Sequence, residues 1–330
     1  MMFSPVDHSR GPGQLLARER RRPLRSLGVL ALLLWSLPVQ ADVSVSDAFP
    51  VAPHESVQAT RPDVAMRPDG EFVVAWERHP EAGSGNVLAR RFAEDGTALG
   101  KPFRVTSAPG HQGEPAVAMA EDGKFLVAWS GDGIQHAGIH ARIFAPDGSA
   151  LTKPFLVHAA TPGGNEHAPS ATAVGNGFAV AWVSSSGVSA IRLGENGTAH
   201  GGYSHAESDV TGVQVRGLPA SGLALAWSST HYLSLSLDSE GPVARVDGVV
   251  LSSTDEVVDE FRANEPRSGS SYDYIVDGEQ RVSLASAADG AFTVAYDSGV
   301  PRYVYNVDDH DGPVHLGARL EMFDASADGF

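Results

Sequence analysis

The residues of this sequence that are best suited to chemistry are histidines and aspartates in segments that do not repeat. Of the 13 histidines, 12 lie after residue 41, and eight of these fall in or beside long irregular segments. They are His54, His79, His111, His136, His158, His167, His231 and His310. With a carboxylate such as Asp132, these imidazoles would supply nitrogen and oxygen ligands for a metal ion or form a proton-sensitive site. The alternative is that exposed loops collect polar residues, since no motif such as H-E-x-x-H is present.

The segment YVYNVDDHDG (303–312) has the highest density of such residues. Its acids that could coordinate calcium are Asp308, Asp309 and Asp311. Their spacing differs from that of an EF-hand loop, so an acidic loop in solvent is the alternative. We therefore expect no cofactor, with calcium as the one candidate.

Tyrosines occur in pairs in two of the irregular segments. Tyr303 and Tyr305 form one pair, and Tyr272 and Tyr274 form the other. Tyrosine offers a broad amphipathic surface on which a sugar can stack. Alternating tyrosines are equally typical of an ordinary β-strand, so both interpretations stay open.

The elements that must position these residues are marked by a recurrent motif. DGEFVVAW (69–76) returns 53 residues later as DGKFLVAW (122–129), and then as NGFAVAW (176–182). Fixed-period similarity of this kind is typical of repeat architectures. We place the copies at about 62–105, 115–157, 169–203, 213–251 and 282–330, with an irregular insertion at about 252–281. The aromatic anchors of the copies are Trp76, Trp129, Trp182, Trp227 and Tyr296.

Each copy predicts four short antiparallel strands. The first two strands meet at a turn such as Asp69-Gly70, in which we expect both residues to tolerate positive φ. Four strands per copy without helical periodicity predict an all-β fold, a β-propeller of four-stranded blades. We expect five blades, closed by residues 46–51 acting as the missing fourth strand of the last copy. A degenerate extra blade within 252–281 and an open two-sheet sandwich are the alternatives.

The cassette P-x-VA-x4-DG-x-FVVAW … ARRF … G … PFRV resembles a repeat of exported bacterial proteins of the adhesin and RTX-associated type. The resemblance is strong in the first two copies and weak in the third and fourth. It implies β-propeller blades and export, and it carries no catalytic motif. The RTX calcium nonapeptide is missing, so calcium does not follow from the resemblance.

The first 41 residues are expected to be a signal peptide rather than part of the fold. A basic stretch precedes the apolar run LGVLALLLWSL (27–37), and small residues follow at Ala41. Both general secretion and twin-arginine export fit, because RRPLR (21–25) loosely matches the latter. We expect an exported protein, extracellular or periplasmic, with no stable membrane insertion after cleavage.

Charge and cysteine content exclude several classes of function. Six of the 24 basic and two of the 40 acidic residues lie in residues 1–41, which leaves 18 basic and 38 acidic residues, a net charge of −20. This balance argues against nucleic acid as a partner, because binding it requires positive surface. The chain has no cysteine, which excludes thiol chemistry and thiolate metal sites.

We place function on the propeller face that carries the irregular loops, since repetition marks what the fold needs. The expected ligand-binding residues are His54, His79, His111, Asp132, His136, His167, Tyr303, Tyr305 and His310. We expect a monomeric, non-catalytic module that binds carbohydrate or protein. The alternatives are a secreted glycan-active hydrolase using carboxylates of the same face, and a structural spacer. The recurrent Arg90, Arg142 and Arg319 are expected to pair with neighbouring acids rather than to form a catalytic cluster.

Overall fold

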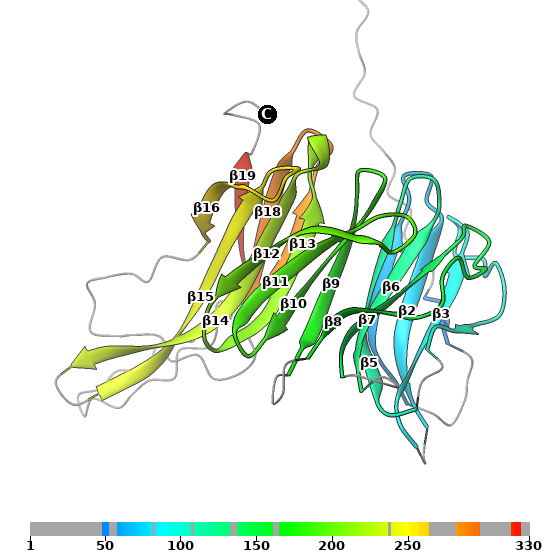
Figure 1. Ribbon diagram of the computed structural model, residues 1–330, viewed down its shortest axis with the longest axis horizontal. Helices are drawn as coiled ribbons and strands as arrows, with labels where there is room; N and C mark the ends of the chain where they lie inside the picture. The colour runs from blue at the N-terminus through cyan, green and yellow to red at the C-terminus, as the bar shows by residue number, and fades with distance from the viewer. Residues whose placement is uncertain are drawn as a thin grey trace, which may run out of the picture. The chain divides into compact units, whose positions relative to one another are not determined.

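The computed structural model describes residues 48–52, 58–80, 83–106, 109–132, 137–160, 165–236, 239–263, 282–297 and 318–324 (Figure 1). These residues form five antiparallel sheets in chain order. The first sheet comprises β1 (Gln58–Met66), β2 (Phe72–His79), β3 (Asn86–Phe92) and β4 (Phe103–Arg104). The second comprises β5 (Gln112–Met119), β6 (Phe125–Gly131), β7 (Gly138–Phe144) and β8 (Phe155–Ala159).

The remaining sheets follow the same order with small differences. The third comprises β9 (His167–Val174), β10 (Gly177–Ser184), β11 (Gly187–Leu193) and β12 (Ala199–Ala206). The fourth comprises β13 (Val210–Gly217), β14 (Leu223–Ser236), β15 (Ser239–Leu251) and β16 (Val257–Arg262), with the short 3-10 helix η1 (Pro219–Ser221) after β13. The fifth comprises β17 (Val282–Ser286), β18 (Ala291–Asp297) and β19 (Ala318–Asp324). The β14–β15 hairpin is the longest of the set (Figure 1).

The Asp-Gly turns close the hairpins differently from the expectation. The amide of Gly70 donates to the carbonyl of Arg67, and Gly70 alone has positive φ, at 89°. Asp69 contributes its side chain instead, because Oδ1 accepts the amide of Glu71 at 3.2 Å. Asp122, Asp147, Asn196 and Asp289 accept the amide two residues on in the same way. Of the two turn residues expected to tolerate positive φ, only the glycine adopts it, and the aspartate stabilises the turn by a local hydrogen bond.

The core consists of the faces on which successive sheets pack. Trp129 of the second sheet packs with Val73, Ala75 and Ala89 of the first. Trp182 packs in the same way against the second sheet, Trp227 against the third and Tyr296 against the fourth. All four side chains are buried. The recurrent aromatic thus fills the space between one sheet and the preceding one.

The first strands of successive sheets lie side by side in the order β1, β5, β9, β13, β17. Side chains bridge them where no ladder exists: Asp63 Oδ2 accepts the amide of Val117 at 2.7 Å. Ser170 Oγ accepts the amide of Val215 at 3.1 Å in the same way. Repeated four-stranded antiparallel sheets packed face to face, with their first strands adjacent, are the blades of a β-propeller. The predicted fold class is confirmed, and five separate sheets replace the two-sheet alternative.

Residues 49–51 lie against the first sheet, in a position that the repeat occupies again in the next blade. Phe49 packs on Phe72 and Phe92 of the first sheet with centroid distances of 6.4 and 5.6 Å. Phe103, which begins β4, packs on Phe125 and Phe144 of the second sheet at 6.3 and 5.4 Å. Phe49 therefore occupies the same position on the first sheet as Phe103, from the fourth strand of the first blade, occupies on the second sheet. Residues 48–50 have no strand assignment, so closure of the last blade by residues 46–51 stays a prediction.

The end of the fourth copy differs from the expectation. The fourth copy was expected to end at residue 251, but β16 pairs with β15 and extends the sheet to Arg262. The first part of the expected insertion thus completes the fourth blade, and residues 264–281 lie outside the described residues. On β1, Val64 and Met66 are 57% and 60% exposed, whereas the equivalent Val117 and Met119 on β5 are buried. The face of β1 thus lacks the cover that the first sheet gives to β5.

Candidate functional site

The first strands of the sheets line a cavity of about 680 Å³, here called the axial channel. β1, β5, β9 and β13 provide most of its wall, and Ser286 of β17 completes it. Its charged and amide side chains are Arg61, Asp63, Glu114, Gln214 and Arg216. This polar set contrasts with the apolar faces between sheets, so the channel is a candidate site for a polar ligand.

A repeated backbone distortion places the residues at one end of the channel, here called the mouth. Arg61, Glu114 and Ala168 each precede a proline and have positive φ, at 48°, 52° and 48°. The strand register shifts at each of these positions, as expected of a β-bulge. Left-handed φ is strained for residues with a side chain. The backbone therefore repeats through three blades, while the side chain changes from arginine to glutamate to alanine.

Glu77 is the centre of the polar contacts at the mouth. Its side chain is fully buried, and Oε2 accepts hydrogen bonds from Arg61 Nη1 at 3.1 Å and from the amide of Glu114 at 3.2 Å. His79 Nε2 and His111 Nε2 lie 2.9 and 3.4 Å from Oε1. Glu77 therefore joins the first two blades, and both imidazoles lie against its Oε1, which accepts no hydrogen bond among the described residues.

The second carboxylate of the mouth belongs to Glu114. Its Oε2 accepts hydrogen bonds from Ser130 Oγ and from the amide of Ala168, each at 2.9 Å. Its Oε1 lies 4.0 Å from Arg61 Nη2. Glu77 and Glu114 thus converge on the same guanidinium, but only Glu114 lines the channel.

Asp63 and Arg216 lie deeper in the channel, on β1 and β13. Burial raises the pKa of Asp63, and this effect exceeds the lowering by its hydrogen bonds and by the charge of Arg216. Burial also lowers the pKa of Arg216, against the attraction of Asp63. Both groups are therefore held in a poorly solvated part of the channel.

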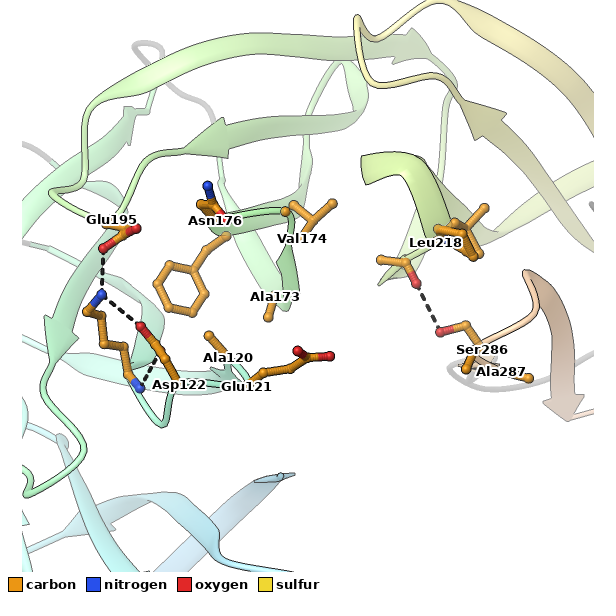
Figure 2. Close-up of a pocket in the computed structure, with 16 residues that line it drawn as sticks. Ala120, Glu121, Asp122, Ala173, Val174, Asn176, Glu195, Leu218, Ser286 and Ala287 are labelled. Carbon is orange, nitrogen blue, oxygen red and sulfur yellow. Dashed lines mark hydrogen bonds and ion pairs between the residues drawn. The ribbon is translucent and has the colours of Figure 1, made fainter. Parts of the chain in front are cut away.

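A second cavity, of about 590 Å³, lies at the end of the blades that carries the Asp-Gly turns (Figure 2). It shares Ala173, Gly217 and Ser286 with the axial channel, so the two cavities adjoin. Lys124 Nζ bridges Asp122 and Glu195 at 2.7 and 2.5 Å, and these hydrogen bonds raise the pKa of Lys124 to about 12. Because Lys124, the basic residue that lines this cavity, is already paired with two carboxylates, this cavity is the weaker candidate.

Three of the predicted site residues, His79, His111 and Asp132, lie together near Glu77, and none of them lines the axial channel. His79 and His111 stack with ring centroids 6.1 Å apart, and the amide of His111 donates to Asp132 Oδ2 at 2.9 Å. His167, at the start of β9, directs its Nδ1 to the carbonyl of Asn165. The other predicted site residues lie outside the described residues: His54, His136, Tyr303, Tyr305, Asp308, Asp309, His310 and Asp311.

Sequence reasoning missed the channel residues Arg61, Asp63, Glu114 and Arg216, and the buried Glu77. Arg61, Glu77 and Glu114 lie at the ends of the irregular segments 52–61, 77–86 and 106–114, in which the prediction favoured histidines. Asp63 and Arg216 lie on predicted strands, outside those segments. One feature of the sequence could have indicated Glu77. This glutamate follows the recurrent Trp76, whereas Ser130 and Val183 follow the tryptophans of the second and third copies.

The recurrent arginines of the third strands differ from the prediction that they pair with acids. Arg90 donates to the carbonyls of Gly100 and Val51, and Arg142 donates to those of Thr152 and Val105. Each guanidinium also lies over a phenylalanine ring of its own strand, at 5.4 and 5.2 Å. Their role is to tie strands together.

Across the described ranges, no group of three or more His, Asp or Glu side chains is arranged to hold a metal ion. No helix in the described part of the chain is long and apolar enough to span a bilayer.

Comparison with known proteins yields likeness of fold only. No protein-family model and no curated protein sequence matches the chain. An endo-arabinase from Bacteroides thetaiotaomicron has a TM-score of 0.44 at 13% identity, over 86% of this chain and all of that one. A protein of unknown function from Dyadobacter fermentans has a TM-score of 0.36 at 14% identity, over 83% and 97%. An α-L-arabinofuranosidase from Clostridium thermocellum has a TM-score of 0.39 at 10% identity, over 72% and 82%. Likenesses this distant carry no conclusion about activity.

Proposed function

We propose that this protein is an exported binding module that takes a carbohydrate ligand into the mouth of the axial channel. One observation carries the proposal: Arg61, Asp63, Glu114, Gln214 and Arg216 gather in one cavity on strands whose backbone repeats. Ligand sites are typically concave, with a few convergent polar groups. Mixed donors and acceptors of this kind match sugar hydroxyls, which both donate and accept hydrogen bonds.

Hydrolysis of a glycan is the second candidate, and Asp63 favours it. A carboxyl group whose pKa is raised by burial can act as a general acid. Glu114 lines the same channel and is partly exposed, so it could act as the second carboxylate that glycoside hydrolysis requires.

A glycan array probed with the wild-type protein tests the proposal. We expect one class of glycan to bind, Glu114→Gln to weaken its binding by about tenfold or more, and the exposed Glu256→Gln to leave it unchanged. An empty array, or equal binding by both variants, would contradict the proposal. Release of reducing sugar from the bound glycan by the wild type, lost in Asp63→Asn, would favour hydrolysis over binding alone.

A further inference from the structure

Arg216 stands out from the equivalent residues of the other blades. It occupies the fourth position after the start of the repeat, where the other copies have Ala65, Ala118, Thr172 and Ala285. Small side chains suffice for the fold at this position in the other four blades. The arginine is therefore an addition on the wall of the channel, and it is half-buried there.

The guanidinium of Arg216 has few partners. Within the residues that the structure describes, its hydrogen bond is the one from Nη1 to the carbonyl of Val215, at 2.7 Å. Asp63 attracts it across the channel, but no described carboxylate lies within ion-pair distance. Arginine has five N–H donors, so most of them remain available.

Arg192 shows how this fold satisfies an arginine that has only a structural role. Its Nε donates to Asp255 Oδ1 at 2.6 Å, and its other nitrogens donate to the carbonyls of Ser221 and Ser252 at 2.9 and 2.8 Å. A desolvated charge without such partners is costly. The lowered pKa of Arg216 reflects the same loss of solvation. A ligand that supplies the missing partner would recover this cost.

The chemistry of the Arg216 guanidinium indicates which class of ligand it would bind. Its planar fork matches a carboxylate, with which it forms two parallel hydrogen bonds. Gln214 and Ser286 lie on the same channel wall and can bind hydroxyl groups. Arg216 precedes Gly217, where the two cavities adjoin, whereas Arg61 and Glu114 are at the mouth. The carboxylate of Glu114 opposes an anion at the mouth, so the charged end of a ligand belongs at Arg216.

We infer that Arg216 binds the carboxylate of a uronic acid residue, so that the channel takes an acidic glycan with its charged end innermost. This inference deepens the proposed function and rests on it. Neutral sugars would still contact the polar groups of the mouth, with lower affinity. The hydrogen bonds that a ligand carboxylate gains from the Arg216 guanidinium correspond to a preference of about tenfold or more for the acidic glycan.

Titration calorimetry with trigalacturonate and with the neutral galactose trimer tests the inference. Wild type should bind trigalacturonate about tenfold or more tightly than the neutral trimer. Arg216→Gln should abolish that preference without weakening the neutral trimer, and Arg216→Lys should retain part of it. Arg262→Gln, on the exposed fourth strand β16, is the matched control and should keep the wild-type preference.

The outcomes separate the inference from the proposed function. Equal binding of the two trimers by wild type, or a preference that survives Arg216→Gln, would overturn the role of Arg216 and leave carbohydrate binding intact. Binding of neither trimer, together with an empty glycan array, would overturn both. If Arg216→Gln fails to fold, the Arg216→Lys variant decides, because it keeps the charge and loses the paired hydrogen bonds. A lysine variant with the full wild-type preference would contradict the inference.

Discussion

The two ends of the blades use repetition in opposite ways. At the turn end, backbone and side chains recur together: Gly70, Gly123 and Gly148 have φ near 85–89°, and the preceding aspartates accept the same local hydrogen bond. At the mouth, the bulge recurs in three blades but its side chain changes from Arg61 to Glu114 to Ala168. A feature that recurs in full serves the fold. A recurrent backbone with changing side chains is a frame on which a site can be built.

Removing a recurrent anchor should have the largest effect, and it should act on stability. Trp129→Ala empties a buried position between the first two sheets and should lower the free energy of unfolding by about 3–5 kcal/mol. Urea unfolding measures this. Leu151→Ala, at a half-exposed residue beside a turn, should change it by less than about 0.5 kcal/mol. Comparable losses in both variants would show that the recurrent aromatic is not the anchor.

The mouth predicts an energetic coupling between Gly113 and Glu77. A Cβ atom at Gly113 would lie 2.6 Å from Glu77 Oε2, so Gly113→Ala must displace this buried carboxylate. Overpacking of this kind should cost about 1–3 kcal/mol. The cost should shrink in the Glu77→Ala background, which a double-mutant cycle of unfolding free energies measures. Strictly additive effects would mean that Glu77 does not occupy this position.

The turn end predicts a smaller cost that arises from the backbone. Gly148 has φ of 85°, and a Cβ there would approach Arg91 Cδ at 3.2 Å. Gly148→Ala should therefore destabilise by about 1–2 kcal/mol through left-handed strain. In Gly212→Ala the new Cβ would meet only Ser228 Oγ, at 3.8 Å, and no cost of this size is expected. A tolerated alanine at residue 148 would contradict the predicted turn geometry.

The smallest expected effect is on the pH dependence of stability, and its sign should differ between Asp63 and Asp147. Because burial raises the pKa of Asp63, protonation of this carboxylate favours the folded state. The resulting contribution to stability is fully present below the ordinary aspartate pKa and is lost as the pH rises through the raised value. Asp63→Asn should therefore gain stability relative to wild type between pH 4 and pH 7.

Asp147 provides the opposite case. Hydrogen bonds from the side chain and backbone of Ser149 lower the pKa of Asp147, so its contribution is present above the ordinary aspartate pKa and lost as pH falls. Asp147→Asn should lose stability relative to wild type over the same rise in pH. Thermal unfolding at both pH values measures the two differences, and equal signs would refute the assigned environments.

The sequence predicted the parts of the fold that recur and missed the parts that do not. Turn glycines, strand order and the tryptophan anchors follow from local chemistry, which every copy repeats. The axial channel could not be predicted, because it depends on which residues the bulges of neighbouring blades bring together. Glu77, for example, begins the irregular segment 77–86, and only packing shows it buried between Arg61 and His79. His79, His111 and Asp132 were predicted from composition, but the contacts among them were not.

The most direct test of the account compares a mouth variant with a turn variant in two measurements. Ligand affinity and unfolding free energy are measured for Glu114→Gln and Gly148→Ala, with the glycan that wild type binds on the array. The account predicts that Glu114→Gln weakens affinity about tenfold or more with little loss of stability, because the amide oxygen still accepts the hydrogen bond from Ala168. It predicts that Gly148→Ala loses stability and keeps wild-type affinity. Loss of affinity in Gly148→Ala alone would contradict the assignment of the site to the mouth.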